Sequence, residues 1–329
     1  MSQQPPSFAD IEAAAQRIAG LAVRTPLLEH PVLNDRVGGR ALLKAENFQR
    51  VGAFKFRGAY NAVSQVDRKQ YPGGVVACSS GNHAQGVAAA AALCDMPAVI
   101  VMPEDAPKLK VERTRASGAE IVLYDRATGD RFKIATDIAA ERGADVVHPF
   151  DDPRVMAGQG TVGLELMAQA AEVGAAPDAV LVCTAGGGLL SGVALAVKAA
   201  RPETTVHSVE PARFDDFARS LAAGERLQNE ARSGSICDAL LVDQPGVLTF
   251  GVATELCGAG IVVTDEEAAD AMRFAFLELK LVLEPGGAVA LAALLTGKFD
   301  AKGKTVVAVL SGGNVDPSLF SQIIGNGAG

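Results

Sequence analysis

A lysine between two phenylalanines is the residue of this chain whose setting most clearly predicts chemistry. Lys55 lies in the segment Gly-Ala-Phe-Lys-Phe-Arg-Gly at residues 52–58. An ammonium group pressed against apolar rings loses hydration, which lowers its pKa and leaves a fraction of free amine that can attack a carbonyl carbon. Schiff-base lysines need this property. The alternative is that the Lys55 stem lies on an apolar surface with its ammonium group in water, so other motifs must decide.

A glycine-rich turn predicts a phosphate site. Residues 184–188, Thr-Ala-Gly-Gly-Gly, stand between a strand-like run and a helix-like run. Glycines let the backbone approach a phosphate closely, and a helix N-terminus offers free N–H groups, although a turn that only packs tightly is the alternative. Glu210 lies where a dinucleotide site would place its ribose contact, but the required third glycine is Ser191. The turn therefore favours a single phosphate group over a pyrophosphate.

Two further turns carry polar side chains. Residues 79–83, Ser-Ser-Gly-Asn-His, precede a helix-like run, and residues 311–314, Ser-Gly-Gly-Asn, follow the last strand-like run. Helix capping explains one of the four polar residues in the first turn, but not all of them. Ligands of open α/β sheets bind beyond the carboxyl ends of the strands, so we expect the three turns to face one crevice together with Lys55.

An α/β fold is expected to position these turns, because Val- and Ile-rich runs alternate with Ala-rich helical stretches. This alternation predicts mainly parallel sheets with right-handed crossovers. The expected strands span residues 75–78, 98–102, 120–124, 145–147, 179–183, 205–209 and 305–310. The expected helices span residues 84–93, 132–141, 189–200 and 266–279. We expect a small substrate-side domain at residues 72–150, and a large cofactor-binding domain formed by residues 1–71 plus 151–329.

Composition limits the class of partner. The 329 residues are 49% hydrophobic, which suffices for the cores of two domains. A net charge of −8 without a basic cluster argues against nucleic acid, and apolar runs fall short of the roughly 20 residues that span a bilayer. The polar first residues predict no secretion signal, and five cysteines without a paired motif predict neither disulfides nor zinc. We expect a cytoplasmic protein that binds a small molecule.

The motifs together resemble the fold-type II pyridoxal-phosphate enzymes, in the branch of serine racemase, serine/threonine dehydratase and β-hydroxyaspartate dehydratase. The resemblance covers residues 24–317 and rests on separated motifs in a common order. They are Arg-Thr-Pro-Leu at 24–27, Glu-Asn-Phe-Gln at 46–49, Phe-Lys-Phe-Arg-Gly-Ala at 54–59, Ala-Gly-Gln-Gly-Thr at 157–161 and the three turns. The resemblance implies two open twisted α/β domains, an active site between them, and a homodimer that binds pyridoxal phosphate and an amino acid.

The resemblance also implies a role for each site residue. Lys55 forms the Schiff base with pyridoxal phosphate and takes the α-proton from one face of the substrate, while Ser80 stands on the other face as acid or base. Asn82 bonds the 3′ oxygen of the pyridine ring, and Ser311 meets the ring nitrogen. The cofactor phosphate is held by the backbone of Ala185, Gly186, Gly187, Gly188 and Leu189. The substrate carboxylate is held by Ser79, Asn82 and His83.

A divalent cation is implied as well. In the resembled branch Glu210, the carbonyl of Phe214 and Asp216 match the ligands of Mg²⁺ or Ca²⁺, and oxygen ligands suit such hard cations. A solvated acidic loop is the alternative. Three positions depart from the family pattern: Ala53, where Ser is common; Ala185, where Gly is common; and Asp238-Ala239, where Asp-Gly is frequent. The last departure borders the expected substrate and favours elimination over racemisation.

The resemblance thus implies a dehydratase that removes water from L-threonine or L-serine and releases a 2-oxo acid and ammonia. A serine at the ring nitrogen suits elimination, because an unprotonated ring is a weaker electron sink. One alternative is β-hydroxyaspartate dehydratase, since Arg131 and His148 match positions near the far side of the substrate and a cation there suits a second carboxylate. Another is serine racemase with dehydratase side activity, using Lys55 and Ser80. Outside the family stand a nicotinamide oxidoreductase and a non-catalytic metabolite-binding protein.

Overall fold

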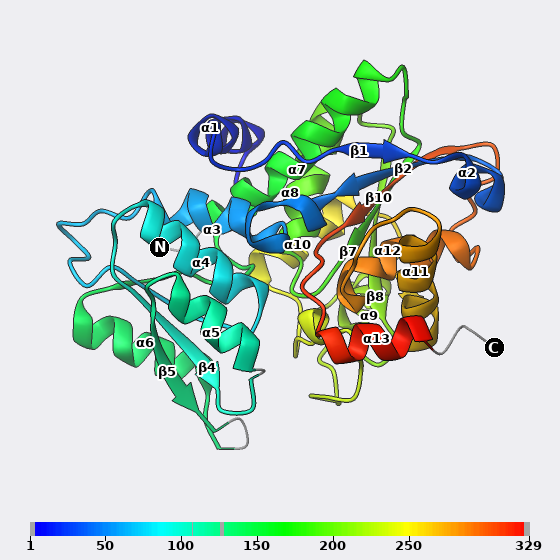
Figure 1. Ribbon diagram of the computed structural model, residues 1–329. Helices are drawn as coiled ribbons and strands as arrows, with labels where there is room; N and C mark the ends of the chain where they lie inside the picture. The colour runs from blue at the N-terminus through cyan, green and yellow to red at the C-terminus, as the bar shows by residue number, and fades with distance from the viewer. Residues whose placement is uncertain (1–3, 107, 126–127, 326–329) are drawn as a thin grey trace.

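The computed structural model describes residues 4–106, 108–125 and 128–325, and its larger sheet has six strands (Figure 1). These strands are β1 (Leu27–Glu29), β2 (Arg40–Ala45), β7 (Ala179–Cys183), β8 (Thr205–Pro211), β9 (Ile261–Val263) and β10 (Thr305–Leu310). Their order across the sheet is β1-β2-β10-β7-β8-β9. The pair β1 and β2 is antiparallel, and the other neighbouring pairs are parallel. The predicted α/β class with mainly parallel sheets is therefore confirmed.

The smaller sheet has four parallel strands, β3 (Val75–Cys78), β4 (Ala98–Pro103), β5 (Glu120–Tyr124) and β6 (Asp145–Val146). Their order is β5-β4-β3-β6. All four lie within residues 72–150, but the core on one face of this sheet also includes Ala59 and Ala62, which precede that range. The domain boundaries therefore stay a prediction, and their outermost residues, 1–3 and 326–329, lie outside the described part of the chain.

Helices connect the strands and surround both sheets. The longer ones are α1 (Phe8–Ile18), α3 (Lys55–Val63), α4 (Asn82–Leu93), α5 (Lys108–Ala116), α6 (Arg131–Arg142), α7 (Pro153–Glu172), α8 (Gly188–Ala200), α10 (Val247–Leu256), α11 (Asp265–Leu277), α12 (Pro285–Leu295) and α13 (Pro317–Gly325). The shorter ones are α2 (Pro31–Val37), α9 (Asp216–Ala223) and the single turns η1 (Glu46–Phe48), η2 (Arg50–Gly52) and η3 (Asp238–Leu240). Within the described ranges, no helix has the length and apolar character that crossing a membrane requires.

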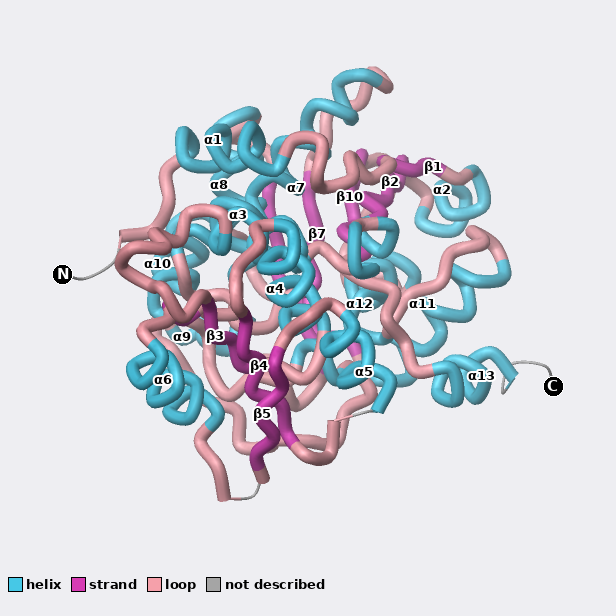
Figure 2. Tube along the Cα trace, turned by 60° about the vertical axis from the view of Figure 1, so that its left-hand side comes forward, coloured by secondary structure: helices cyan, strands magenta, loops and turns pink. Residues whose placement is uncertain are grey.

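Alternate residues of each strand pack on opposite faces of the sheets. In β7, Leu181 packs with α11 and α12, whereas Val180 and Val182 pack with α7 and α8. In the smaller sheet, Val75 packs with α3 and α4, whereas Val76 packs with α6. Figure 2 shows α4 and α6 on opposite sides of β3 and β4. Because helices cover both faces, the inner strands β3 and β7 are apolar on both faces rather than alternating with polar residues.

Capping signals differ among the helices that begin near the strand ends. The carboxylate of Asp152 accepts from the N–H of Arg154 at the start of α7, and that of Asp130 accepts from the N–H of Phe132 at the start of α6. In contrast, α4 begins after Gly81 and α8 begins after Gly187, and neither has a side-chain cap. The first N–H groups of α4 and α8 are therefore available to a ligand.

Candidate active site

One cavity gathers the three turns and Lys55. It is lined by Lys55 and Arg131, by residues 78–83 after β3, by residues 183–190 after β7, and by Ser311 after β10. Thus all predicted cofactor and substrate residues border one space, as the rule for open parallel sheets leads one to expect. The predicted metal residues, Glu210 and Asp216, are not among its lining residues.

Lys55 is the first residue of α3 and lines the cavity. The Nζ atom donates a hydrogen bond to the carbonyl of Pro149 at 2.7 Å and lies 5.2 Å from the centroid of the Phe54 ring. Burial lowers the pKa of the Lys55 ammonium from 10.5 to about 8. This is the direction that its apolar neighbours predict, and it leaves a neutral fraction that can act as nucleophile and base.

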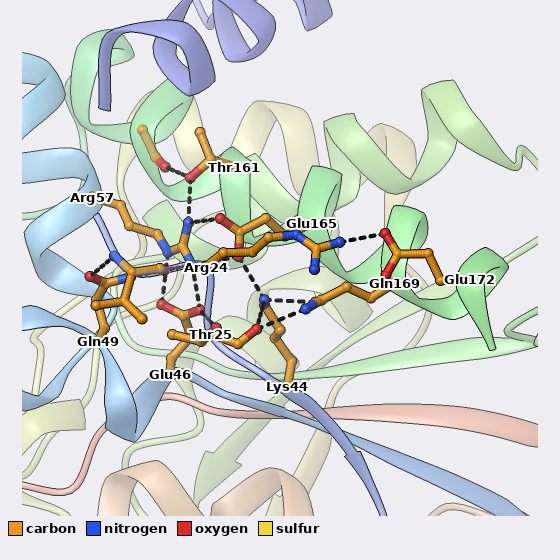
Figure 3. Close-up of polar contacts among 12 residues, drawn as sticks. Arg24, Thr25, Lys44, Glu46, Gln49, Arg57, Thr161, Glu165, Gln169 and Glu172 are labelled. Carbon is orange, nitrogen blue, oxygen red and sulfur yellow. Dashed lines mark hydrogen bonds and ion pairs between the residues drawn. The ribbon is translucent and has the colours of Figure 1, made fainter. Parts of the chain in front are cut away.

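A buried ionic network fixes the helix that carries Lys55 (Figure 3). The guanidinium of Arg57, two residues further along α3, binds both oxygens of Glu46 at 2.8 Å and both oxygens of Glu165 at 2.7 and 2.8 Å. Lys44 adds a second cation, with Nζ 2.7 Å from Glu165. Two cations and two carboxylates balance one another, which a buried cluster requires. The network therefore joins α3 to the end of β2 and to α7.

Close backbone contacts position the same helix. A Cβ atom at Gly158 of α7 would lie 2.5 Å from the Cα of Gly58, and a Cβ atom at Gly86 of α4 would lie 3.3 Å from the carbonyl of Lys55. Glycine at these positions lets α3 pack tightly between α7 and α4. Because α4 belongs to the smaller sheet and α7 to the larger one, Lys55 stands where the two parts of the molecule meet.

The glycine turn after β7 has the form of an anion site. Gly187 has a φ of +93°, and a Cβ atom there would lie 2.4 Å from the Phe217 ring. A Cβ atom at Gly186 would lie 2.4 Å from the Phe150 ring. Side chains are therefore excluded from the turn, and the uncapped N–H groups of α8 face the cavity. Together with the Lys55 amine and the Ser311 hydroxyl in the same cavity, this turn fits pyridoxal phosphate.

Asn82 is held from two sides. Its Nδ2 donates to Glu284 Oε1 at 2.6 Å, and its Oδ1 accepts from Asn314 Nδ2 at 2.8 Å. Glu284 is buried in the cavity wall, and burial raises the pKa of its carboxyl group to about 7. Sequence reasoning missed Glu284, because a glutamate before Pro-Gly-Gly reads only as the residue that precedes a helix. The hydrogen bond of Asn314 thus connects the turn at residues 311–314 to the turn at residues 79–83.

The two histidines near the site are neutral. Burial lowers the pKa of His83 to about 3 and that of His148 to about 4, and the Lys55 charge contributes to both shifts. The His83 Nε2 lies 3.0 Å from the Val147 carbonyl, so it carries the proton, and the buried Nδ1 has no partner among the described residues. An unprotonated Nδ1 cannot donate to a carboxylate. Any contact of His83 with a substrate carboxylate must therefore come from its backbone N–H.

The remaining predicted site residues also line the cavity. Ser79 Oγ accepts from the N–H of Gly81 at 3.2 Å, which folds the turn before α4. Ser80 also lines the cavity and lies beyond the end of β3 at Cys78. Arg131 is the first residue of α6, and its guanidinium carbon lies 5.0 Å from the centroid of the Phe132 ring. The His148 ring stacks on that same Phe132 ring, with 5.0 Å between the ring centroids. The Phe132 ring therefore contacts both Arg131 and His148.

The predicted metal residues form a separate acidic site. Glu210 at the end of β8 accepts from the N–H groups of Phe217 and Ala218 at 2.9 and 2.7 Å. Burial, and then the charge of Asp216, raises the pKa of Glu210 well above its usual value, and burial raises that of Asp216 to about 7. In the described part of the chain, Asp216 Oδ2 is buried without a partner. Such an oxygen fits a hard cation, although the described residues hold no group of three or more His, Cys, Asp or Glu side chains arranged for a metal.

Comparison with known proteins agrees with this geometry. The model of the family described as pyridoxal-phosphate dependent enzymes matches residues 18–312. The chain is 42% identical to an L-threo-3-hydroxyaspartate ammonia-lyase from a Pseudomonas species, over 97% of this chain and 98% of that protein. It is 41% identical to an L-threonine ammonia-lyase from Thermotoga maritima, over 97% of this chain and 78% of that protein.

Solved structures support the same assignment. The structure of maize serine racemase is 38% identical to this chain, has a TM-score of 0.90 and is matched over 98% of both chains. The relatives bear the names of the predicted dehydratase and of both alternatives within the family. The nicotinamide oxidoreductase and the non-catalytic binding protein are left without support. The chain belongs to the family of pyridoxal-phosphate dependent enzymes and has the fold-type II architecture.

Proposed function

We propose that the protein is a pyridoxal-phosphate dependent ammonia-lyase that removes water from L-threonine or L-serine and yields a 2-oxo acid and ammonia. The observation that carries this proposal is the position of the Lys55 amine, with its lowered pKa, in the same cavity as a turn shaped for one phosphate. The names of the relatives support the reaction class.

Pyridoxal phosphate, when bound, supplies the electron sink that makes the α-proton of an amino acid acidic. Lys55 Nζ would hold the cofactor, and the same amine would accept the α-proton of the substrate. With a pKa of about 8, roughly a tenth of the unbound Lys55 side chains carry a neutral amine at pH 7. The N–H groups at the start of α4 hold the substrate carboxylate, with Ser79, Asn82 and His83 contributing from that turn.

The residues around the ring set its orientation. Asn82, whose orientation is fixed by Glu284 and Asn314, would meet the 3′ oxygen of the ring. Ser311 offers a hydroxyl group to the ring nitrogen, and a hydroxyl is too weak an acid to protonate it. Residues 185–189 bind the phosphate through the backbone at the start of α8. This combination favours reactions in which the β-hydroxyl leaves as the α-proton is removed.

A second candidate is elimination from β-hydroxyaspartate. It is favoured by Arg131, whose guanidinium borders the cavity and suits a second carboxylate. The L-threo-3-hydroxyaspartate ammonia-lyase relative supports it. Serine racemisation is the other candidate, supported by the presence of Ser80 in the cavity and by the serine racemase relatives. Ser80 would exchange the α-proton on the face opposite to Lys55.

We also propose a cation site, a dimer and a cellular location. Glu210, the Phe214 carbonyl and Asp216 are the ligands proposed for Mg²⁺ or Ca²⁺, and the unpartnered Asp216 Oδ2 supports this. A homodimer is supported by Phe48 and Val282, which are 51% and 44% exposed on segments that touch through the Asn47 side chain. A cytoplasmic location is consistent with five free cysteines.

One panel of measurements tests the function. Release of 2-oxo acid is measured from L-serine, L-threonine and both hydroxyaspartate diastereomers, beside formation of D-serine. Borohydride should fix the cofactor to the wild-type protein and to the control Lys69→Ala, which changes an exposed lysine. Lys55→Ala should lose both the fixation and the activity. Fixation that persists in Lys55→Ala would contradict the assignment of Lys55 as the cofactor lysine. If none of the four substrates yields a 2-oxo acid, the ammonia-lyase proposal is wrong.

A further inference from the structure

An ion pair spans the cavity between the two parts of the molecule. Lys110 belongs to α5, beside the smaller sheet, and Asp238 begins η3, which lies between the strands β8 and β9 of the larger sheet. The Lys110 Nζ donates to Asp238 Oδ2 at 2.5 Å, and both residues line the cavity. The contact joins residues 128 positions apart in the chain. Neither residue belongs to the three turns that bind the cofactor.

The two partners of this pair are unequal. The side chain of Lys110 is 15% exposed, whereas that of Asp238 is 53% exposed. A carboxylate that is half in water regains hydration easily when it leaves an ion pair, but an ammonium that is mostly buried needs an anion beside it. Lys110 is therefore the fixed partner, and Asp238 is the partner that another carboxylate can replace.

The pair lies close to the part of the site that orients the cofactor. After the dominant effect of burial, the charge of Asp238 raises the pKa of Glu284 and that of Lys110 lowers it. Glu284 in turn holds Asn82. Arg131 also lines this cavity. A ligand with one carboxylate at the start of α4 would thus find two cations, Lys110 and Arg131, available for a second carboxylate.

We infer that Lys110 is a specificity-determining residue that binds the distal carboxylate of a dicarboxylic substrate, while Asp238 occupies Lys110 when the substrate has a neutral side chain. The inference rests on the proposed ammonia-lyase function. With serine or threonine, the ion pair stays intact and closes that side of the cavity. With hydroxyaspartate, the distal carboxylate takes the place of Asp238, and Asp238 returns to water.

Two substitutions with opposite effects test the inference in the holoenzyme. Lys110→Gln should lower kcat/KM for L-threo-3-hydroxyaspartate about tenfold or more and change that for L-serine by no more than about twofold, because a charge-assisted contact is lost with one substrate alone. Asp238→Asn should lower KM for hydroxyaspartate, since it frees Lys110 of its competitor. Arg113→Gln, which removes an exposed cation from the same helix, is the matched control and should leave both substrates unchanged.

A binding measurement separates this inference from the proposed function. Malonate, an unreactive dicarboxylate, should raise the melting temperature of the wild-type holoenzyme more than acetate does, and Lys110→Gln should reduce the difference. Equal losses with serine and hydroxyaspartate in Lys110→Gln, or unchanged malonate protection, would overturn the role of Lys110. If the wild type releases ammonia from neither substrate, the ammonia-lyase proposal fails, and malonate protection alone then decides whether Lys110 binds a second carboxylate.

Discussion

At the scale of single residues, Lys55 illustrates how burial makes a side chain reactive. Its ammonium pKa of about 8 predicts that apoprotein binds pyridoxal phosphate covalently at a rate that rises with pH to a midpoint near 8, since only neutral amine attacks the aldehyde. Stopped-flow absorbance over a pH series measures this rate. A midpoint at or above 10 would show that the ammonium is solvated, and Lys55→Met should give no covalent product.

The same shift affects the stability of the apoprotein. The pKa of Lys55 is lower in the folded chain than in the unfolded chain, so the unfolded chain binds more protons between about pH 8 and 10.5. The free energy of unfolding therefore gains a contribution that increases with pH across this window. Lys55→Met should remove that increase. Urea unfolding of both proteins at several pH values measures it, and an equal increase of the unfolding free energy with pH in Lys55→Met would contradict the assignment to Lys55.

Gly187 is a second residue whose role follows from its geometry. Alanine at Gly187 would keep a φ of +93° and place its Cβ 2.4 Å from the Phe217 ring. Gly174→Ala is the matched control, because Gly174 has a φ of +63° with nothing within 4 Å of a Cβ atom. Both variants should lose about 1 kcal/mol of unfolding free energy from backbone strain, and Gly187→Ala should lose more than Gly174→Ala because its Cβ would overlap the Phe217 ring. Only Gly187→Ala should also weaken cofactor binding, by tenfold or more in an absorbance titration.

At the scale of elements, the position of α3 depends on the network of Arg57. Arg57→Met leaves Glu46 buried without its guanidinium partner, and removing one member of a buried pair costs roughly 3–5 kcal/mol. Urea unfolding should show this loss. Arg24→Met is the control, because Arg24 pairs with Glu172 where both side chains are more than half exposed. Similar losses in the two variants would mean that the buried network contributes no more than a surface ion pair.

The sequence predicts some elements well and misses others for physical reasons. Apolar β-branched runs identified the strands β3, β5, β7 and β10 with the bounds that the structure shows. Strand β2 was missed because it contains Lys44, which is buried and stabilised by Glu165, Gln169 and the Thr25 carbonyl. Those partners are distant in sequence, so no local sequence pattern indicates that Lys44 is buried in a strand. Helix α12 is buried on all sides and lacks the apolar stripe that identifies surface helices.

The sequence likewise identifies some residues of the site and misses others. The three turns were found because each carries an unusual local composition after a strand. Lys110 and Glu284 were not found, because one is an ordinary lysine on a polar helix and the other precedes a proline. Both gain their importance from partners more than 100 positions away, Asp238 and Asn82 respectively. The assembly of two sheets around one cavity, rather than any motif, makes these two residues part of the site.

At the scale of the whole molecule, the acidic site beyond β8 predicts a dependence of global stability on divalent cations. A cation that binds the folded chain alone stabilises it by about 2.7 kcal/mol at a hundredfold excess over Kd. Mg²⁺ or Ca²⁺ should therefore raise the melting temperature by several degrees, and a chelator should reverse the rise. Calorimetry of the holoenzyme with and without each cation measures the effect.

The ligand assignment requires that this stabilisation depend on Asp216, whose Oδ2 is buried without a partner in the described chain. Asp216→Asn should abolish the cation-dependent rise, because an amide supplies no charge to offset a dehydrated cation. Without cation the same variant should be as stable as the wild type or more so, since it removes repulsion with Glu210. Glu225→Gln, an exposed carboxylate just beyond α9, should keep the full rise. A rise that is undiminished in Asp216→Asn would place the cation elsewhere and would leave Glu210 and Asp216 as a buried carboxyl pair that binds no cation.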